Sequence, residues 1–305
     1  PYDPAAGRIL ADDAAAPAGR LRVFERVIPG TAARWTTFLP GFPDGSYGYS
    51  RVNEILGSGV TPRLFVEYVG QGDSDKPRNY RYSTLERADL VQAQWEAHGI
   101  MSTFVVSFDY SSLVLLELLA RQADRAAAGQ PGRTRIEAVL IVNGGLFADS
   151  HSHPWQTTPL MKSQAGRIGL FLAQHSRTAF AAILRSAQMY SKDYQVSRRE
   201  IDEMSDAITR RRGAHFGHHA AGFVDEHQRN SNRWDLERLY LLTRDSVRYC
   251  IAGSEQDPFE PRQIAATRAR LGRYGIDVRM FPGGHLTTSE HPDLLASAIS
   301  ELSAL

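Results

Sequence analysis

The residues with the clearest chemical potential lie where a strand-like apolar run leads into an apolar helix, at Ser107-Phe-Asp109-Tyr-Ser111. Small residues two positions before and after a central side chain are typical of a nucleophile elbow, a tight turn that lifts this side chain above a sheet. The following helix N-terminus favours negative charge and would keep Asp109 ionised. A carboxylate there can attack a saturated carbon and form an alkyl ester, which water then hydrolyses. The alternative is that Asp109 only caps the helix.

Two residues near the C-terminus extend this pattern to a triad. Asp257 lies in a turn after a strand-like run, and His285 follows Gly284 in a glycine-rich loop. The interval between them has room for one helix and one strand, which would bring both to the same sheet edge. Alone, Asp257 is typical of a turn and His285 of a surface loop. The chain order nucleophile, acid, histidine favours a catalytic triad instead.

A third candidate is the loop Gly41-Phe42-Pro43, which follows a strand-like segment. Glycine and proline would shape this loop beside the elbow. The amides of Phe42 and Tyr110 could then form an oxyanion hole, a pair of donors for a developing negative charge. The alternative is a simple Gly/Pro turn.

These residues need elements that position them, and strand-like and helix-like segments alternate along most of the chain. The predicted strands are 21–28, 34–39, 64–69, 103–108, 136–142, 247–252 and 278–281, and the predicted helices are 84–98, 112–124, 261–274 and 292–305. Several strand segments are nearly continuous runs of Val, Ile, Leu and Phe, which suit strands buried on both faces of a parallel sheet. The alternation predicts a doubly wound, mostly parallel α/β sheet.

The alternation breaks between residues 147 and 235, where apolar residues follow a helical period at 168–184 and 201–208 and no strand is evident. We therefore predict a core formed by 1–146 and 236–305, with 147–235 inserted as a helical cap. Inserted segments of this kind lie at the carboxyl ends of the strands, where α/β folds place their ligands.

Composition excludes several classes of function. Among 305 residues, 35 Lys and Arg balance 34 Asp and Glu without a basic stripe, which argues against a nucleic-acid partner. The apolar runs are too short for a membrane span, and residues 1–13 lack the features of a signal peptide. A single cysteine, Cys250, excludes an internal disulfide. We expect a cytoplasmic protein that acts on a small molecule.

Seven of the ten histidines fall in the predicted cap, at positions 151, 153, 175, 215, 218, 219 and 227. His215 and His219 have a helical spacing that a metal could use, but no further ligand pattern supports a site. We predict a solvated polar face, no metal and no cofactor. The three arginines at 210–212 are either a solvated face or a contact with another subunit, which leaves a homodimer open.

Five short stretches together resemble α/β-hydrolases of the epoxide hydrolase and haloalkane dehalogenase group. They are Gly-Phe-Pro at 41–43, Gly-Gln-Gly-Asp-Ser-Asp-Lys-Pro at 70–77, Asp-Tyr at 109–110, Asn-Gly-Gly-Leu-Phe at 143–147 and Gly-His at 284–285. Within this group, the chain is most similar to the mesoderm-specific-transcript-like branch. The resemblance implies an α/β-hydrolase fold, a nucleophilic Asp109, a water-activating pair of Asp257 and His285, and an oxyanion hole of Phe42 and Tyr110.

The sequence departs from the family pattern in three places. Pro40 stands where the family usually has His, Phe108 replaces the usual His before the nucleophile, and Ser111 and Ser112 follow Tyr110 where Gly is usual. These departures affect the oxyanion loop and the elbow. They leave open a scaffold that binds a ligand or guides a non-hydrolytic step.

The resemblance also bears on the reaction. Similar dehalogenases hold the halide with a Trp after the nucleophile and an Asn or second Trp, whereas this chain has Tyr110 and Phe42. Phe in the loop is the epoxide hydrolase pattern. The leading prediction is an epoxide hydrolase that forms a covalent Asp109 ester, and the alternative is a haloalkane dehalogenase with the same triad.

Similar epoxide hydrolases bind the epoxide oxygen with two cap tyrosines. Tyr190 and Tyr194 are the candidates here, since residues four apart share one face of a helix, and the alternative is packing within the cap. Trp155 is expected either to line the pocket or to pack under the cap. The Ala- and Arg-rich composition suggests a bacterial source, where similar enzymes modify secondary metabolites.

Overall fold

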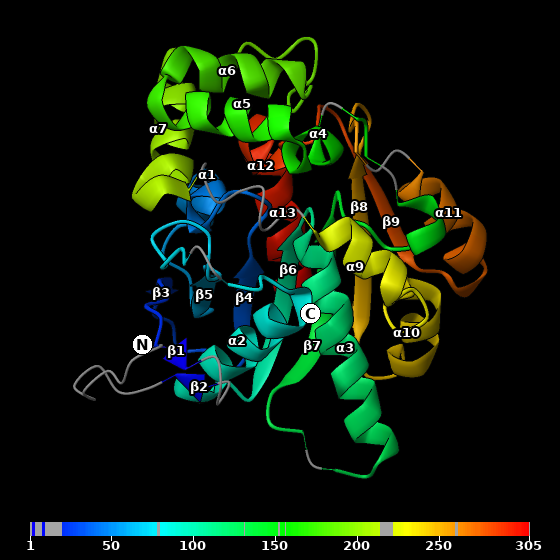
Figure 1. Ribbon diagram of the computed structural model, residues 1–305. Coiled ribbons are helices and arrows are strands. Elements are labelled where there is room, and N and C mark those ends of the chain that lie inside the picture. Colours follow the sequence, from blue (N-terminus) through cyan, green and yellow to red (C-terminus); the bar gives the residue numbers. More distant parts are fainter. Residues whose placement is uncertain are drawn as a thin grey trace.

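The structure is a computed structural model that describes residues 2–3, 8–9, 20–77, 80–130, 132–151, 153–155, 157–213, 222–259 and 262–304. Its centre is a seven-stranded sheet with the strand order β3-β5-β4-β6-β7-β8-β9 (Figure 1). The strands are β3 (Glu25–Ile28), β4 (Trp35–Leu39), β5 (Arg63–Val66), β6 (Ser102–Phe108), β7 (Arg135–Val142), β8 (Arg248–Ser254) and β9 (Asp277–Phe281). Two short strands, β1 (Tyr2–Asp3) and β2 (Arg8–Ile9), pair separately. All seven strands predicted from the sequence are present, with shifted ends.

Neighbouring strands of the sheet are parallel, except that β3 is antiparallel to β5. The central strand β6 is buried from Thr103 to Phe108, and β7 is buried over its last five residues. Helices cover both faces of these strands, so apolar residues occupy consecutive positions and do not alternate with polar ones. The predicted doubly wound, mostly parallel α/β sheet is confirmed.

Two buried clusters fill the space between the sheet and its helices. The first lies against α2 (Thr84–Ala97), α3 (Ser111–Ala127), α10 (Leu236–Thr243) and α11 (Gln263–Leu271), and the second against α1 (Ser50–Leu56) and α13 (Pro292–Ser303). Along β6, Val105 joins the first cluster and Phe104 and Val106 join the second, because successive side chains of a strand point to opposite faces. Within the described ranges, no helix has the length and apolar character needed to cross a membrane.

Between β7 and α10, the described residues form helices and no strand. These are α4 (Thr158–Lys162), α5 (Gln164–His175), α6 (Arg177–Ser186), α7 (Arg198–Thr209) and α9 (Phe223–Arg229). Helices α4 to α7, named the lid here, lie at the end of the sheet where β6 leads into α3 (Figure 1). The helical period at 168–184 covers two helices, because the Ser176 hydroxyl caps α6 by accepting the Ala179 amide at 3.2 Å.

Helix α9 packs on the core, and its Asp225 also forms an ion pair with Lys162 of α4 in the lid. Phe223 belongs to the first buried cluster, and Trp234 Nε1 donates to Glu117 Oε2 of α3 at 2.7 Å. The inserted segment therefore consists of a lid above the sheet end and a second part that rests against α3. Treating 147–235 as one separate unit stays a prediction.

Candidate active site

The turn between β6 and α3 holds Asp109 in a left-handed backbone conformation with a φ of 55°. Aspartate tolerates this region better than most residues, and such strain is typical of a nucleophile elbow. The turn is crowded, since a Cβ at Gly41 would lie 2.6 Å from Phe108 Cδ1. The tight turn therefore raises the Asp109 carboxylate from the strand end into a cavity wall.

The serines that depart from the family pattern fit this turn through hydrogen bonds. The Ser111 hydroxyl donates to the Pro40 carbonyl, and the Ser112 hydroxyl donates to the Gly145 carbonyl at 3.2 Å. These bonds join the elbow to the loops that follow β4 and β7. Pro40 needs no amide for this contact, so Pro40 and Ser111 are compatible with an intact elbow.

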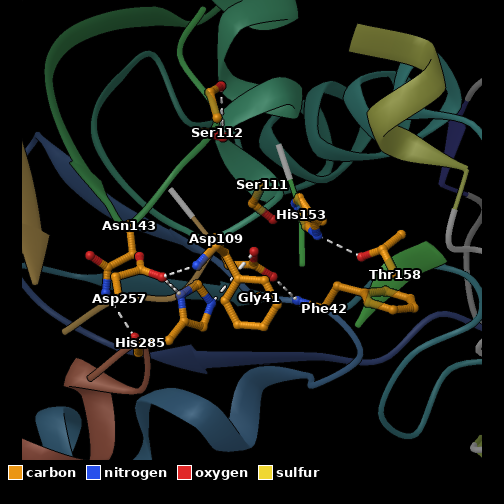
Figure 2. A network of polar contacts seen from close by, with 12 residues as sticks. Gly41, Phe42, Asp109, Ser111, Ser112, Asn143, His153, Thr158, Asp257 and His285 are labelled. Atoms are coloured by element: carbon orange, nitrogen blue, oxygen red, sulfur yellow. Dashed lines mark hydrogen bonds and ion pairs between the residues drawn. The ribbon is translucent and has the colours of Figure 1, made fainter. Parts of the chain in front are cut away.

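Backbone amides surround the Asp109 carboxylate (Figure 2). The Phe42 amide donates to Asp109 Oδ2 at 2.8 Å, and the Tyr110 amide also donates to this carboxylate. Burial by itself would raise the pKa of Asp109, but the hydrogen bond and charge of His285, together with these amides, outweigh burial and lower the pKa. Asp109 is therefore ionised near neutral pH, with one oxygen in the predicted oxyanion hole.

Asp257 and His285 lie beside Asp109, as Figure 2 shows. His285 Nδ1 is 3.1 Å from Asp257 Oδ1, and His285 Nε2 is 3.6 Å from Asp109 Oδ1. All three side chains are buried. The Phe259 amide also donates to Asp257 Oδ1 at 2.8 Å, which orients that carboxylate. The structure thus brings together the three residues of the predicted triad.

Two carboxylates flank the His285 ring. Burial lowers the pKa of His285, but the charge of Asp257 and the hydrogen bonds and charge of Asp109 outweigh burial and raise the pKa to about 10. In this state His285 is an imidazolium that pairs with Asp109. Loss of the Asp109 charge would remove part of this stabilisation and lower the pKa, so that His285 could then accept a proton.

The structure adds Asn143 to the residues that position the triad. Asn143 Nδ2 donates to the His285 carbonyl oxygen at 2.8 Å, and Asn143 Oδ1 accepts the Ser254 amide at 2.8 Å. The end of β7 therefore holds the ends of β8 and of the His285 loop together. In the sequence, Asn143 was marked only as part of the Asn-Gly-Gly motif, which by itself predicts no contact with the His285 loop.

A cavity of about 190 Å³ lies between the triad and the lid, and its lining is mainly apolar. The apolar lining includes Phe42, Leu160, Met161, Leu170, Phe180, Ile183, Leu184, Phe223 and Phe259. The polar side chains on the described lining are Asp109, His153, Thr157, Thr158, Ser186 and His285. The site thus combines one ionised carboxylate and a few hydrogen-bonding groups with apolar walls.

The two cap tyrosines lie elsewhere. Tyr190 and Tyr194 line a separate surface hollow, and neither is part of the cavity above Asp109. Their rings stack at 5.2 Å, but the segment between them is not helical. Tyr194 donates its hydroxyl to Glu200 of α7. The expectation that these tyrosines reach the substrate pocket therefore differs from their observed positions.

Trp155 also lies away from the cavity. Its side chain is 70% exposed, and it neither lines the pocket nor packs beneath the lid. The segment from the end of β7 to α4 instead directs His153 and Thr158 to the cavity. The sequence contains no signal for this inward direction of His153, because side-chain direction in an irregular segment has no period to reveal it.

Three of these histidines form a connected group. His151 contacts His227 through their Nδ1 atoms at 2.7 Å, and contacts His153 through their Nε2 atoms at 3.1 Å. His227 is fully buried and His151 is nearly so. In the part of the chain that the structure describes, no group of three or more His, Cys, Asp or Glu residues is arranged to hold a metal ion. His215 and His219 lie outside the described residues.

Acidification is expected to destabilise the protein through this group. Burial lowers the pKa of His151 to about 4 and, together with neighbouring His151, that of His227 to about 3. Unfolded histidines bind a proton below about pH 6.5, whereas these remain neutral in the fold. The unfolded state then binds more protons, so the free energy of unfolding falls by up to about 1.4 kcal/mol per pH unit for each histidine.

This effect can be measured as the difference in unfolding free energy between wild type and the double variant His151→Gln/His227→Gln. The difference removes contributions from other titrating groups, such as the carboxyl of Asp44, whose pKa is raised by desolvation to about 7. Urea unfolding at pH 7, 6 and 5 should show the wild type losing stability relative to the variant as the pH falls. A difference that does not change with pH would contradict the neutral, buried state of the two imidazoles.

Comparison with known proteins agrees with this fold. The model of the alpha/beta hydrolase family matches residues 38–298, and the chain therefore belongs to this family. The bovine mesoderm-specific transcript homolog protein is 34% identical over 115 residues, which are 37% of this chain and 33% of that protein. The match thus spans about a third of that relative's length. The predicted resemblance to the mesoderm-specific-transcript-like branch is confirmed.

Two solved structures illustrate how widely the fold is shared. The haloalkane dehalogenase DatA from Agrobacterium tumefaciens C58 has a TM-score of 0.69 at 17% identity, with 94% of each chain covered. The epoxide hydrolase CorEH has a TM-score of 0.65 at 16% identity, covering 93% of this chain and 95% of that one. At these identities the likeness establishes the fold alone.

Proposed function

We propose that the protein is a hydrolase that opens an epoxide ring through a covalent ester on Asp109. The observation that carries this proposal is the environment of that carboxylate. Asp109 Oδ2 accepts a hydrogen bond from the Phe42 amide, while Asp109 Oδ1 lies 3.6 Å from His285 Nε2. The carboxylate forms part of the wall of an apolar cavity. An ionised carboxylate so placed is a nucleophile for carbon, and the same amides can stabilise the later tetrahedral intermediate.

The reaction then has two halves. In the first, an oxygen of Asp109 bonds to an epoxide carbon while the bond from that carbon to the epoxide oxygen breaks. In the second, water attacks the ester carbonyl, and His285 accepts a proton from that water while Asp257 orients the imidazole. Because the ester carries no negative charge, the His285 imidazolium is no longer paired on that side, releases its proton to solvent and can then act as a base.

The cavity lining favours an epoxide over a halide as the leaving group. Its described polar groups include the hydroxyls of Thr158 and Ser186 and the imidazole of His153, which suit an oxygen atom. Neither Trp nor Asn belongs to the described lining, so the halide-binding pair expected of a dehalogenase has no counterpart there. The apolar walls suit a hydrophobic epoxide. A role in bacterial secondary metabolism is part of the proposal.

Incubation with an aryl epoxide and, separately, with a bromoalkane tests the reaction class. Release of a diol from the epoxide is expected, with little bromide from the bromoalkane. Bromide release without diol would assign the same triad to dehalogenation. Binding of both compounds without turnover would favour a scaffold that guides a non-hydrolytic step. The Asp109→Ala protein is the background control for non-enzymatic epoxide opening.

A further inference from the structure

A chain of polar groups leads from the cavity wall into the interior. Thr158 Oγ1 lies 2.7 Å from His153 Nδ1, and His153 Nε2 lies 3.1 Å from His151 Nε2. His151 Nδ1 lies 2.7 Å from His227 Nδ1, and His227 Nε2 lies 3.2 Å from the Trp234 carbonyl oxygen. Thr158 and His153 line the cavity (Figure 2), so the chain connects the cavity with a buried carbonyl.

The buried carbonyl sets the direction of every hydrogen bond when the three imidazoles are neutral. The Trp234 oxygen only accepts, so His227 carries its proton on Nε2 and accepts through Nδ1 from His151. His151 Nε2 then accepts from His153, whose Nδ1 accepts the hydroxyl proton of Thr158. In this state the Thr158 hydroxyl offers the cavity lone pairs and no proton.

One added proton reverses only the last hydrogen bond. A proton on His153 Nδ1 makes this nitrogen a donor to Thr158 Oγ1, so the Thr158 hydroxyl turns its own proton into the cavity. The bonds of His151 and His227 keep their direction. Burial lowers the pKa of both inner histidines, to about 4 and about 3, which disfavours an added proton on His151 or His227.

This end of the chain lies close to the triad. The His153 ring contacts the Phe259 ring at 5.3 Å, and the Phe259 ring contacts His285 at 4.5 Å. The negative charge of Asp109 acts on His151, where it opposes the effect of burial on the pKa. The nucleophile and the Thr158 hydroxyl thus face the same cavity, with a protonatable imidazole behind the hydroxyl.

Since Tyr190 and Tyr194 lie outside the cavity, the epoxide oxygen needs another proton donor. We propose that the Thr158 hydroxyl donates its proton to the epoxide oxygen while Asp109 attacks carbon, and that His153 resupplies the proton from behind. This inference rests on the proposed epoxide hydrolysis. Thr158 is then the group that touches the reacting oxygen, and His151 and His227 are positioning residues that orient His153.

The protons balance over one turnover. In the first half, the Asp109 ester forms, the epoxide oxygen gains the Thr158 proton, and Thr158 takes the Nδ1 proton of His153, which becomes neutral. His285, no longer paired with a negative Asp109, releases its own proton to solvent, accepts a proton from the attacking water and passes that proton to the leaving alcohol oxygen, which gives the diol and Asp109 as a carboxylic acid. Asp109 ionises, and its proton returns the chain to the state with protonated His153. His285 takes a proton back from solvent once Asp109 is negative again.

The first half can be measured alone in a His285→Gln background, where the ester on Asp109 should accumulate. With styrene oxide as the probe, intact mass against time reports the rate of alkylation. Thr158→Val removes the hydroxyl and should slow alkylation by about a hundredfold, the usual contribution of a general acid. Thr158→Ser keeps the hydroxyl and should alkylate at close to the background rate.

A matched control and an isotope readout separate proton donation from a structural effect. Thr209→Val makes the same change in the lid, where the hydroxyl donates to the Ser205 carbonyl away from the cavity, and should leave the rate unchanged. Alkylation in the background protein should be slower in deuterated water. His153→Gln retains a polar contact for Thr158 but cannot resupply a proton, so it should lower both the rate and this isotope effect.

Equal alkylation rates for Thr158→Val and the background protein would overturn the inference while leaving the Asp109 ester in place. An equal loss in Thr209→Val would also overturn it, because the lid as a whole would then be responsible. Absence of any adduct in the background protein would instead overturn the proposed epoxide hydrolysis itself.

Discussion

Replacement of Asp109 by alanine is expected to abolish turnover, with a loss of about 10⁴-fold or more. The variant loses the only atom that bonds to the substrate carbon in the proposed first step, and neither Asp257 nor His285 can replace it from its present position. The Asp109 side chain faces the cavity, so the fold should survive its removal. Steady-state diol formation measures the loss of turnover, and thermal unfolding checks that the fold survives.

The backbone at this position calls for a second variant. Alanine at a φ of 55° is strained, whereas asparagine tolerates this region and keeps the shape of aspartate without its charge. Early in the reaction, Asp109→Asn should therefore be at least as inactive as Asp109→Ala, and it should be more stably folded. Asp245→Ala, an exposed change of the same type, should retain full activity. Near-normal diol formation by Asp109→Ala would exclude the covalent mechanism.

Replacement of His285 by glutamine is expected to trap the intermediate. Alkylation needs no base, since the Asp109 carboxylate is already ionised, but the ester cannot be hydrolysed quickly without a group that accepts the proton of water. Given a substrate epoxide, turnover should fall by several powers of ten while a covalent adduct approaches one per protein chain. Intact mass should equal protein plus epoxide, and peptide mapping should place the addition on Asp109.

Labelled water gives an independent check on the same intermediate. In a single turnover of wild type in heavy-oxygen water, the first diol should contain ordinary oxygen from the Asp109 carboxylate, and the label should enter the protein. Fully labelled diol, together with no adduct in His285→Gln, would mean that water attacks the epoxide directly. Asp109 would then be at most a base.

The sequence by itself determined the sheet and predicted the three residues that the structure brings together at the candidate site, because both depend on local patterns. Continuous apolar runs mark strands covered on both faces, as in β6 and β7, and a helix pattern that begins at once marks the elbow. Asp257 follows the buried strand β8, and His285 follows the edge strand β9. Parallel strands place their carboxyl ends at one edge, so three loops distant in sequence meet wherever the strand order allows.

Only the tertiary structure decided which side chains surround the substrate cavity. Tyr190 and Tyr194 have helical spacing, but their segment is irregular and faces another hollow. His151 and His227 meet although 76 positions separate them, and His153 turns inward from a segment without any period. In strands and helices, side chains point to a given face at regular intervals, and the spacing of apolar residues in the sequence reveals these intervals. In irregular segments there is no such interval, and the direction of each side chain depends on packing across the whole molecule.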